Sequence, residues 1–345
     1  MDDLIRVLVV DDSAFMRYTV AKYLATDPDI DVVGSARDGV DALSKVSSLK
    51  PDVVTLDVEM PKMDGLTALK HIMAKQPTPV VMLSSLTQKG TRTTIRALMR
   101  GAVDFVAKPS AKANTRTVMK ELISKVKAAS GVRSSSSTLT YTEQSRSKQK
   151  SVGLRPFNKG DPLVIIGTST GGPRALQDVL SSLPANLVAA VLVVQHMPAG
   201  FTRSLASRLN EISPLTIQEA IGGDRLAQGL VLLAPGDYHL VFKDYKRVTL
   251  NRGPRRRHVR PSTDVTMESA VRFHGSSLIG VILTGMGSDG TDGARMIKQV
   301  GGRIIAQDKS TSVVYGMPRS VVEAGLADRV VPLSAIASTL ADFLK

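Results

Sequence analysis

The chain has 345 residues, which favours two domains, and 43% of them are hydrophobic, so each domain can bury a core. It contains no cysteine, which excludes disulfides and cysteine-based metal sites or nucleophiles. The net charge of +14 would suit a nucleic-acid partner, but the excess is densest in residues 130–160, which carry six basic residues and one acidic residue. Neither flanking region is strongly basic, so we expect no nucleic-acid binding.

Changes in composition along the chain predict three segments. Residues 1–129 and 161–345 form two domains, and residues 130–160 form a flexible, basic, Ser-rich linker. The first residues, MDDLIRVLVV, lack the basic region of a signal peptide, and no apolar run reaches the length of a membrane span. We therefore expect a cytoplasmic protein without membrane insertion.

The first domain alternates short apolar runs with amphipathic stretches in one regular series. This alternation predicts an α/β fold with a doubly wound, five-stranded parallel sheet. Ser13 is a suitable N-cap for the first helix. The strands are expected at residues 5–10, 32–33, 53–56, 80–83 and 105–106, and the later helices over 40–46, 66–73, 95–99 and 118–126.

Polar side chains stand where the predicted strands of this domain end. Ligands bind at the carboxyl ends of parallel strands, so these side chains can share one site. Close carboxylates repel one another, and Mg²⁺ relieves that repulsion while also binding phosphate oxygens. A lysine and a hydroxyl beside them suit a pocket that accepts a phosphoryl group on one carboxylate. The residues are Asp11, Asp12, Asp57, Ser84 and Lys108.

These residues, with Met60-Pro61, Asp64-Gly65 and Lys108-Pro109, resemble a two-component receiver domain over the first third of the chain. The resemblance implies that a sensor histidine kinase phosphorylates Asp57. It also implies that Asp11, Asp12 and Asp57 bind Mg²⁺. Ser84, Phe105 and Lys108 would then respond to the phosphoryl group.

The second domain resumes the alternation of strands and helices. Its pattern predicts another doubly wound, mostly parallel α/β fold with an antiparallel insertion, in which residues 244–246 form a hairpin turn. Thr263 or Asp264 is expected to cap a helix. The strands are expected at residues 163–166, 187–194, 230–233, 240–242, 248–250, 278–283, 303–306 and 330–331.

The stretch LVIIGTSTGG, residues 163–172, carries the strongest catalytic signal. It fits G-x-S-x-G, the sharp strand-to-helix turn that exposes a nucleophilic serine, here Ser169. Two other readings are a tight turn without chemistry and a phosphate-binding turn. A dinucleotide site would need an acidic residue at the end of the next strand, but that strand ends in Gln195-His196. This favours a nucleophile with a histidine base.

Ser169, His196 and Asp289 each follow a predicted strand, so they can meet at one edge of the sheet. Serine needs a base to act as a nucleophile, and a carboxylate fixes the tautomer of that base. Their order along the chain differs from that of α/β-hydrolases. Other candidates for the base and the carboxylate are His239, His258, His274 and Asp292.

The second domain contains the motifs Ser169-Thr170-Gly171-Gly172, Gln195-His196-Met197-Pro198, and those at residues 234–237, 260–262, 284–290 and 315–318. In these motifs residues 161–345 resemble the chemotaxis protein-glutamate methylesterase. The resemblance implies hydrolysis of glutamate γ-methyl esters on chemoreceptors, release of methanol, and deamidation of receptor glutamines. It implies Ser169 as nucleophile, His196 as base and Asp289 as its orienting acid, with Thr170 and Met286 supporting the oxyanion and no cofactor in this site.

We therefore expect a serine esterase that phosphorylation of its receiver domain regulates, with a chemotaxis histidine kinase and methyl-accepting receptors as partners. The alternatives are a response regulator with a DNA-binding output domain and a non-catalytic receptor-binding adaptor. The predicted elements contain no helix-turn-helix pattern, which disfavours the first alternative. The arginines at 252, 255–257 and 260 fit either a solvated loop or a contact surface for an acidic partner.

Overall fold

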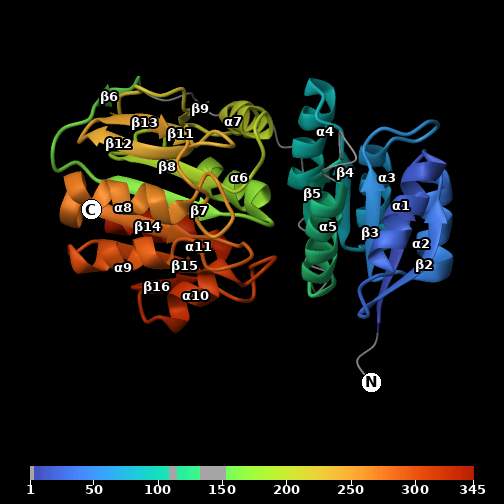
Figure 1. Ribbon diagram of the computed structural model, residues 1–345. Coiled ribbons are helices and arrows are strands. Elements are labelled where there is room, and N and C mark those ends of the chain that lie inside the picture. Colours follow the sequence, from blue (N-terminus) through green and yellow to red (C-terminus); the bar gives the residue numbers. More distant parts are fainter. Residues whose placement is uncertain (1–3, 109–114, 133–152) are drawn as a thin grey trace. The chain divides into compact units, whose positions relative to one another are not determined.

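The computed structural model describes residues 4–108, 115–132 and 153–345 (Figure 1). Contacts divide the chain into two units, Met1–Glu143 and Gln144–Lys345, and each is described by itself. Most of the predicted linker, residues 133–152, and Pro109 of the receiver motif lie outside the described residues.

The first unit contains a five-stranded sheet in the order β2-β1-β3-β4-β5, in which every neighbouring pair is parallel. This confirms the predicted fold. The sheet lies between two layers of helices, because α1 packs on α5 while α3 packs on α2 and α4. Its strands are β1 (Ile5–Val10), β2 (Ile30–Ala36), β3 (Val53–Asp57), β4 (Val80–Ser84) and β5 (Asp104–Ala107). Its helices are α1 (Ala14–Leu24), α2 (Gly39–Leu49), α3 (Gly65–Lys75), α4 (Gln88–Met99) and α5 (Thr115–Ser130).

The local sequence explains where these elements begin. Every residue of β3 and β4 is buried, as continuous apolar runs predict for strands that are covered on both faces. The Ser13 hydroxyl accepts a hydrogen bond from the Met16 N–H at 3.3 Å, so Ser13 caps α1 as predicted. Asp38, Asp64 and Thr87 cap α2, α3 and α4 in the same way.

The second unit is built on a seven-stranded sheet in the order β16-β15-β14-β7-β8-β11-β9. Every neighbouring pair in this sheet is parallel. The chain runs outward from β7 in one direction and later returns to the other side of β7 with β14. Ligand sites form where strand order reverses in this way, which places the site at the ends of β7, β8 and β14. The strands are β7 (Leu163–Thr168), β8 (Ala190–Gln195), β9 (Thr216–Glu219), β11 (Leu230–Leu233), β14 (Leu278–Ile282), β15 (Arg303–Gln307) and β16 (Arg329–Val331).

Helices cover both faces of this sheet (Figure 1). One layer contains α6, α7 and α11, and the other contains α8, α9 and α10. Among the described residues the core includes the fully buried side chains of β7, β8 and β14. The helices are α6 (Gly172–Ser182), α7 (Phe201–Ile212), α8 (Thr263–His274), α9 (Thr291–Gln299), α10 (Met317–Glu323) and α11 (Leu333–Phe343), with a 3₁₀ turn, η2 (Gly275–Ser277).

The predicted antiparallel insertion is the hairpin of β12 (His239–Asp244) and β13 (Arg247–Asn251), whose turn lies between these strands as expected. A second antiparallel pair, β6 (Arg155–Pro156) with β10 (Ala227–Gln228), was not predicted. Phe157 follows β6 and belongs to the core of the second unit, although the sequence places it in the linker. Two-residue strands carry no periodicity, so the sequence alone gave no signal for this pair.

Several elements of the first unit are longer than predicted, such as β2 and α4, and two predicted starts in the second unit are wrong. The strand expected at 187–194 begins at Ala190, because Leu187 and its neighbours form a turn. The N-cap of α8 is Ser262 rather than Thr263 or Asp264: the Ser262 hydroxyl accepts the Val265 N–H at 3.4 Å. The prediction of Thr263 or Asp264 as the cap was therefore wrong by one residue.

Candidate functional site

The turn between β7 and α6 holds Ser169 at the end of a central strand. The Ser169 N–H donates to the Thr284 carbonyl at 3.0 Å, and the Ser169 carbonyl accepts the Gly172 N–H at 2.9 Å. Gly171 has a φ of 80°, which favours glycine. A Cβ at Gly172 would lie 2.0 Å from the side-chain oxygen of Gln195, so only glycine leaves room for that side chain. The glycines of the motif therefore serve the backbone geometry that holds the serine.

His196 follows β8, the strand beside β7. Its N–H donates to the Thr168 carbonyl at 3.1 Å, which places the His196 backbone next to the residue before Ser169. Its ring Nε2 lies 2.7 Å from Asp289 Oδ2, and the side chains of His196 and Asp289 are 10% and 3% exposed. The structure thus brings the candidate base and the candidate carboxylate into a direct hydrogen bond.

Asp289 follows β14 and lies at the N-terminus of α8. Its carboxylate accepts hydrogen bonds from the Ser262 hydroxyl at 2.7 Å, the Thr263 N–H at 2.6 Å and the Asp264 N–H at 3.1 Å. Burial alone would raise the pKa of Asp289, but the hydrogen bonds from His196, Ser262 and Thr263 outweigh it and hold that pKa well below its usual range. Asp289 is therefore an ionised, fully engaged partner for the histidine.

The other candidates for the base and the carboxylate lie in different surroundings. His274 is buried between Phe157 and Phe242, with ring centroids at 5.8 and 4.9 Å. The ring of His239 lies 3.0 Å from the Pro254 carbonyl. His258 is exposed, on the loop before α8. Asp292 forms ion pairs with Arg256, Arg257 and Arg295.

Gly285 packs directly on the candidate nucleophile. A Cβ at Gly285 would lie 2.8 Å from Ser169 Cβ and 3.0 Å from Ser169 N. Met286 follows Gly285 and is 37% exposed, and Thr170 follows Ser169 and is buried. The Thr170 carbonyl accepts the Thr284 hydroxyl at 2.9 Å, which ties the two segments together. Thr170 is thus the chain neighbour of the serine and Met286 follows the glycine that packs on it, and their support of an oxyanion stays a prediction.

The arginine-rich loop before α8 is paired with acidic side chains. Asp237 contacts Arg260 at 2.6 Å, Arg255 at 3.2 Å and Arg252 at 3.7 Å. The side chains of Arg252 and Arg255 are nevertheless 64% and 55% exposed. Exposed ion pairs contribute little to stability, so these two arginines can exchange partners at low cost.

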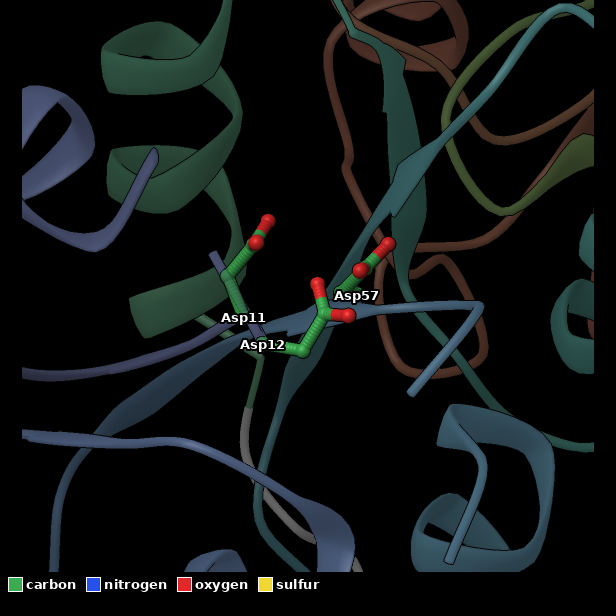
Figure 2. A group of neighbouring side chains, drawn as sticks. All are labelled: Asp11, Asp12 and Asp57. Atoms are coloured by element: carbon green, nitrogen blue, oxygen red, sulfur yellow. The ribbon is translucent and has the colours of Figure 1, made fainter. Parts of the chain in front are cut away.

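In the first unit, Asp11, Asp12 and Asp57 converge where β1 and β3 end (Figure 2). Each offers a carboxylate oxygen, and these oxygens lie within 4.8 Å of one another. The Lys108 ammonium lies 2.8 Å from both Asp11 Oδ2 and Asp57 Oδ2. Asp11 and Asp57 are buried and Asp12 is exposed. One ammonium cannot neutralise three carboxylates, so the donor set fits a hard divalent cation.

The charges of this pocket are strongly coupled. Burial raises the pKa of Asp57 to about 6, although Lys108 acts against this shift. For Lys108, burial acts to lower the pKa, but the hydrogen bonds to Asp11 and Asp57 outweigh it and the pKa is raised. The lysine is therefore a fixed positive charge beside the predicted phosphoacceptor.

Ser84 and Phe105 lie on the neighbouring strands β4 and β5. The Lys108 N–H donates to the Ser84 carbonyl at 2.7 Å, so these two strand ends are adjacent. The Ser84 hydroxyl accepts the Thr94 hydroxyl at 2.6 Å and donates to the Ser85 carbonyl at 3.1 Å. Phe105 is 3% exposed. The phosphoryl-sensing roles of Ser84, Phe105 and Lys108 stay predictions.

The sequence reasoning missed three contacts of these sites. Gln195 donates through its side-chain NH₂ to the Ser169 carbonyl at 2.9 Å, and Asp264 contributes to the surroundings of Asp289. Thr94 contacts Ser84 from α4. Gln195 ends a buried strand beside a candidate base, which is a usable signal. Asp264 reads as an ordinary acidic residue in a first helical turn, so the sequence contains no signal for its contact with Asp289.

No helix in the described part of the chain is both long enough and apolar enough to cross a membrane.

Residues 164–340 match the family described as CheB methylesterase, and residues 7–120 match the response regulator receiver domain. Residues 164–340 contain all three candidate residues Ser169, His196 and Asp289.

Similar proteins match nearly the whole chain. A protein-glutamate methylesterase/protein-glutamine glutaminase of Symbiobacterium thermophilum is 52% identical over 347 residues, which cover 97% of this chain and 96% of that protein. A protein of the same name from Thermotoga maritima is 46% identical and covers 99% of both chains. The crystal structure of the Thermotoga maritima CheB methylesterase catalytic domain aligns with a TM-score of 0.52 at 47% identity, over 53% of this chain and 98% of that one. The chain therefore belongs to the CheB family of protein-glutamate methylesterases/protein-glutamine glutaminases and carries its receiver and methylesterase domains.

Proposed function

We propose that this chain is a phosphorylation-regulated serine esterase that hydrolyses glutamate γ-methyl esters on chemoreceptors and deamidates receptor glutamines. The names of its full-length relatives support both activities. The observation that carries the catalytic proposal is the 2.7 Å hydrogen bond between His196 Nε2 and Asp289 Oδ2. It lies at the end of β8, beside the turn that holds Ser169.

The proposed reaction begins with proton transfer from the serine. Because the ionised Asp289 accepts the hydrogen bond, Nε2 of His196 carries the proton and Nδ1 keeps its lone pair. Ser169 Oγ attacks the ester carbonyl carbon while Nδ1 takes the hydroxyl proton. Asp289 holds the ring and stabilises the imidazolium that forms.

The second half of the reaction returns that proton. The imidazolium donates this proton to the methoxy oxygen, and the bond between the carbonyl carbon and that oxygen breaks. Methanol departs, and Ser169 remains as an acyl-serine. Water then attacks the acyl carbon, its proton passes to His196 and on to Ser169 Oγ, and the free glutamate side chain departs. With a glutamine side chain the same steps release ammonia. Backbone N–H groups near Thr170 and Met286 would bind the oxyanion.

The receiver site supplies the proposed regulation. A Mg²⁺ ion held by Asp11, Asp12 and Asp57 would neutralise their charge and bind the oxygens of the transferred phosphoryl group. An oxygen of Asp57 attacks the phosphorus of the phosphohistidine on a chemotaxis kinase, and the histidine nitrogen leaves. Lys108 then pairs with the added negative charge, and the Ser84 hydroxyl donates to it. Keeping the Asp57 carboxylate ionised for this attack would need both cations, since burial disfavours its charged form.

The test measures methanol release from methylated receptor membranes by the wild type, Ser169→Ala and Asp57→Asn, each with and without a small phosphodonor and Mg²⁺. We expect Ser169→Ala to release no methanol above background. We expect the phosphodonor to raise release by the wild type but not by Asp57→Asn. Release by Ser169→Ala at the wild-type rate would reject the nucleophile, and equal rates with and without phosphodonor would reject the regulation.

A further inference from the structure

The first turns of α8 and α9 hold one another through two buried carboxylates. Asp289, which precedes α9, accepts the N–H groups of Thr263 and Asp264 in the first turn of α8. Asp264, in that first turn of α8, accepts the Gly290 N–H at 2.8 Å and the Gly293 N–H at 2.9 Å at the start of α9. Each carboxylate therefore caps the helix to which the other is attached.

This arrangement satisfies groups that the helices themselves leave open. The first N–H groups of a helix lack partners within it, and a carboxylate there is stabilised by the helix dipole. The N-cap of α9 is Gly290, which has no side chain to accept those N–H groups. Asp264 supplies the acceptor from the neighbouring helix. A carboxylate from α8 thus replaces the missing local cap of α9.

The two helices approach closely enough for this exchange because of two glycines. A Cβ at Gly293 would lie 2.6 Å from Met267 Cβ, and a Cβ at Gly290 would lie 3.2 Å from Thr263 Cγ2, both on α8. Asp264 is 0% exposed, so its carboxylate is not a solvated surface group. Burial and the nearby charge of Asp289 raise the pKa of Asp264 to about 6. Repulsion between the carboxylates of Asp264 and Asp289 lowers the stability of the folded protein, so capping alone does not explain why both are present.

We propose that Asp264 is a positioning residue for the catalytic acid: by fixing Gly290 and Gly293 it sets where Asp289, one residue earlier, meets His196. This inference rests on the proposed function, because it assigns Asp289 a role in the reaction. Asp264 does not touch substrate in this scheme. It acts only through the backbone that carries Asp289 and through its own N–H donated to the Asp289 carboxylate.

The third partner of Asp264 provides a matched control. That partner is Arg257, whose Nε donates a hydrogen bond to Asp264 Oδ2 at 3.3 Å. The same guanidinium contacts the Asp292 carboxylate at 2.6 Å. Asp292 is a carboxylate on α9 with an arginine partner in common, but it faces the arginine-rich loop. Asp292→Asn therefore removes a comparable charge and ion pair without altering the reciprocal caps.

The experiment measures kcat and KM of the full chain for methanol release from receptor membranes that carry tritiated methyl groups. Misplacement of a catalytic group by about 1 Å costs about 100-fold in rate, so we expect Asp264→Leu to lower kcat by about 100-fold with little change in KM. Asp264→Asn keeps an oxygen that can accept both glycine N–H groups, and its kcat should stay within about fivefold of the wild type. Asp292→Asn should change kcat by less than about twofold.

A double-mutant cycle separates positioning from general loosening of the fold. If Asp264 acts through Asp289, the double variant Asp264→Leu/Asp289→Asn should have a kcat within about threefold of that of Asp289→Asn alone. A full further loss of about 100-fold in that background would overturn the proposal. So would a wild-type kcat in a folded Asp264→Leu protein. Should that variant not fold, Asp264→Ser, whose hydroxyl is too short to hold both N–H groups, gives the same comparison.

Ser169→Ala distinguishes failure of this inference from failure of the proposed function. Turnover by Ser169→Ala at the wild-type rate would reject the esterase proposal and the positioning role together. An inactive Ser169→Ala beside a fully active Asp264→Leu would reject the positioning role alone.

Discussion

The buried His274 is predicted to make the second unit sensitive to acid. His274 ends α8 and is 9% exposed, with its ring packed edgewise on Phe157 and Phe242. Burial lowers the pKa of His274 from 6.5 to about 4. Among the described residues its Nε2 has no hydrogen-bond partner. His274→Phe should therefore keep the ring packing and remove the titration.

The sign and size of the effect follow from the difference between the two pKa values. Below pH 6.5 His274 binds a proton in the unfolded chain, whereas in the folded protein it binds this proton only near pH 4. The histidine therefore costs nothing above pH 6.5, and stability is lost progressively as the pH falls from there towards 4. Between pH 8 and pH 5 the loss amounts to about 2 kcal/mol, because each proton bound changes stability by about 1.4 kcal/mol per pH unit.

Hydrogen exchange of the buried strand β7, corrected for the intrinsic effect of pH, measures opening of this unit. From pH 8 to pH 5, opening in the wild type should increase by about 30-fold more than in His274→Phe. The comparison between the two proteins cancels the titration of every other group. Exchange of β3 in the first unit should be equal in both and serves as the control. The same pH dependence of β7 in both proteins would refute the assignment to His274.

Three further predictions concern the catalytic unit. Asp289→Asn should lower kcat for methanol release by about 10³–10⁴-fold, since the base loses its orienting charge. Gly285→Ala should lower kcat by about 10–100-fold in the same assay, because its Cβ would push the nucleophile, whereas Gly153→Ala, with nothing within 4 Å of its Cβ, should not. Replacing Arg252 and Arg255 with glutamate should slow turnover of acidic receptor substrates but not of a small neutral ester; equal slowing of both would exclude a docking role.

Much of the fold could be read from local patterns. Strands β3, β4, β7 and β8 are continuous apolar runs, and such runs between helices require a parallel sheet that is covered on both faces. The rule that polar residues at strand ends share an edge then singled out the aspartates of the first unit and Ser169, His196 and Asp289 of the second. These are consequences of hydrophobic burial and of β-strand geometry, which act within a few residues.

Local sequence patterns did not predict the order of the strands in the sheet. Asp289 reaches His196 from 93 residues away because β14 pairs with β7 and β7 pairs with β8. Asp292 lies only three residues later, in the first turn of α9, and its carboxylate pairs with the arginine-rich loop instead. Phe157 joins the core through a two-residue strand that has no period to detect.

The sequence by itself therefore determined most of the elements, though not the short strands β6, β9 and β10, and which side chains stand at their ends, because helix and strand preferences depend on neighbouring residues. Only the tertiary structure decided which of those ends meet. It placed Asp264 under Gly290 and Gly293, and Ser262 against Asp289. Hydrogen bonds between distant segments depend on how the helices pack on the completed sheet, and that packing is a property of the whole unit.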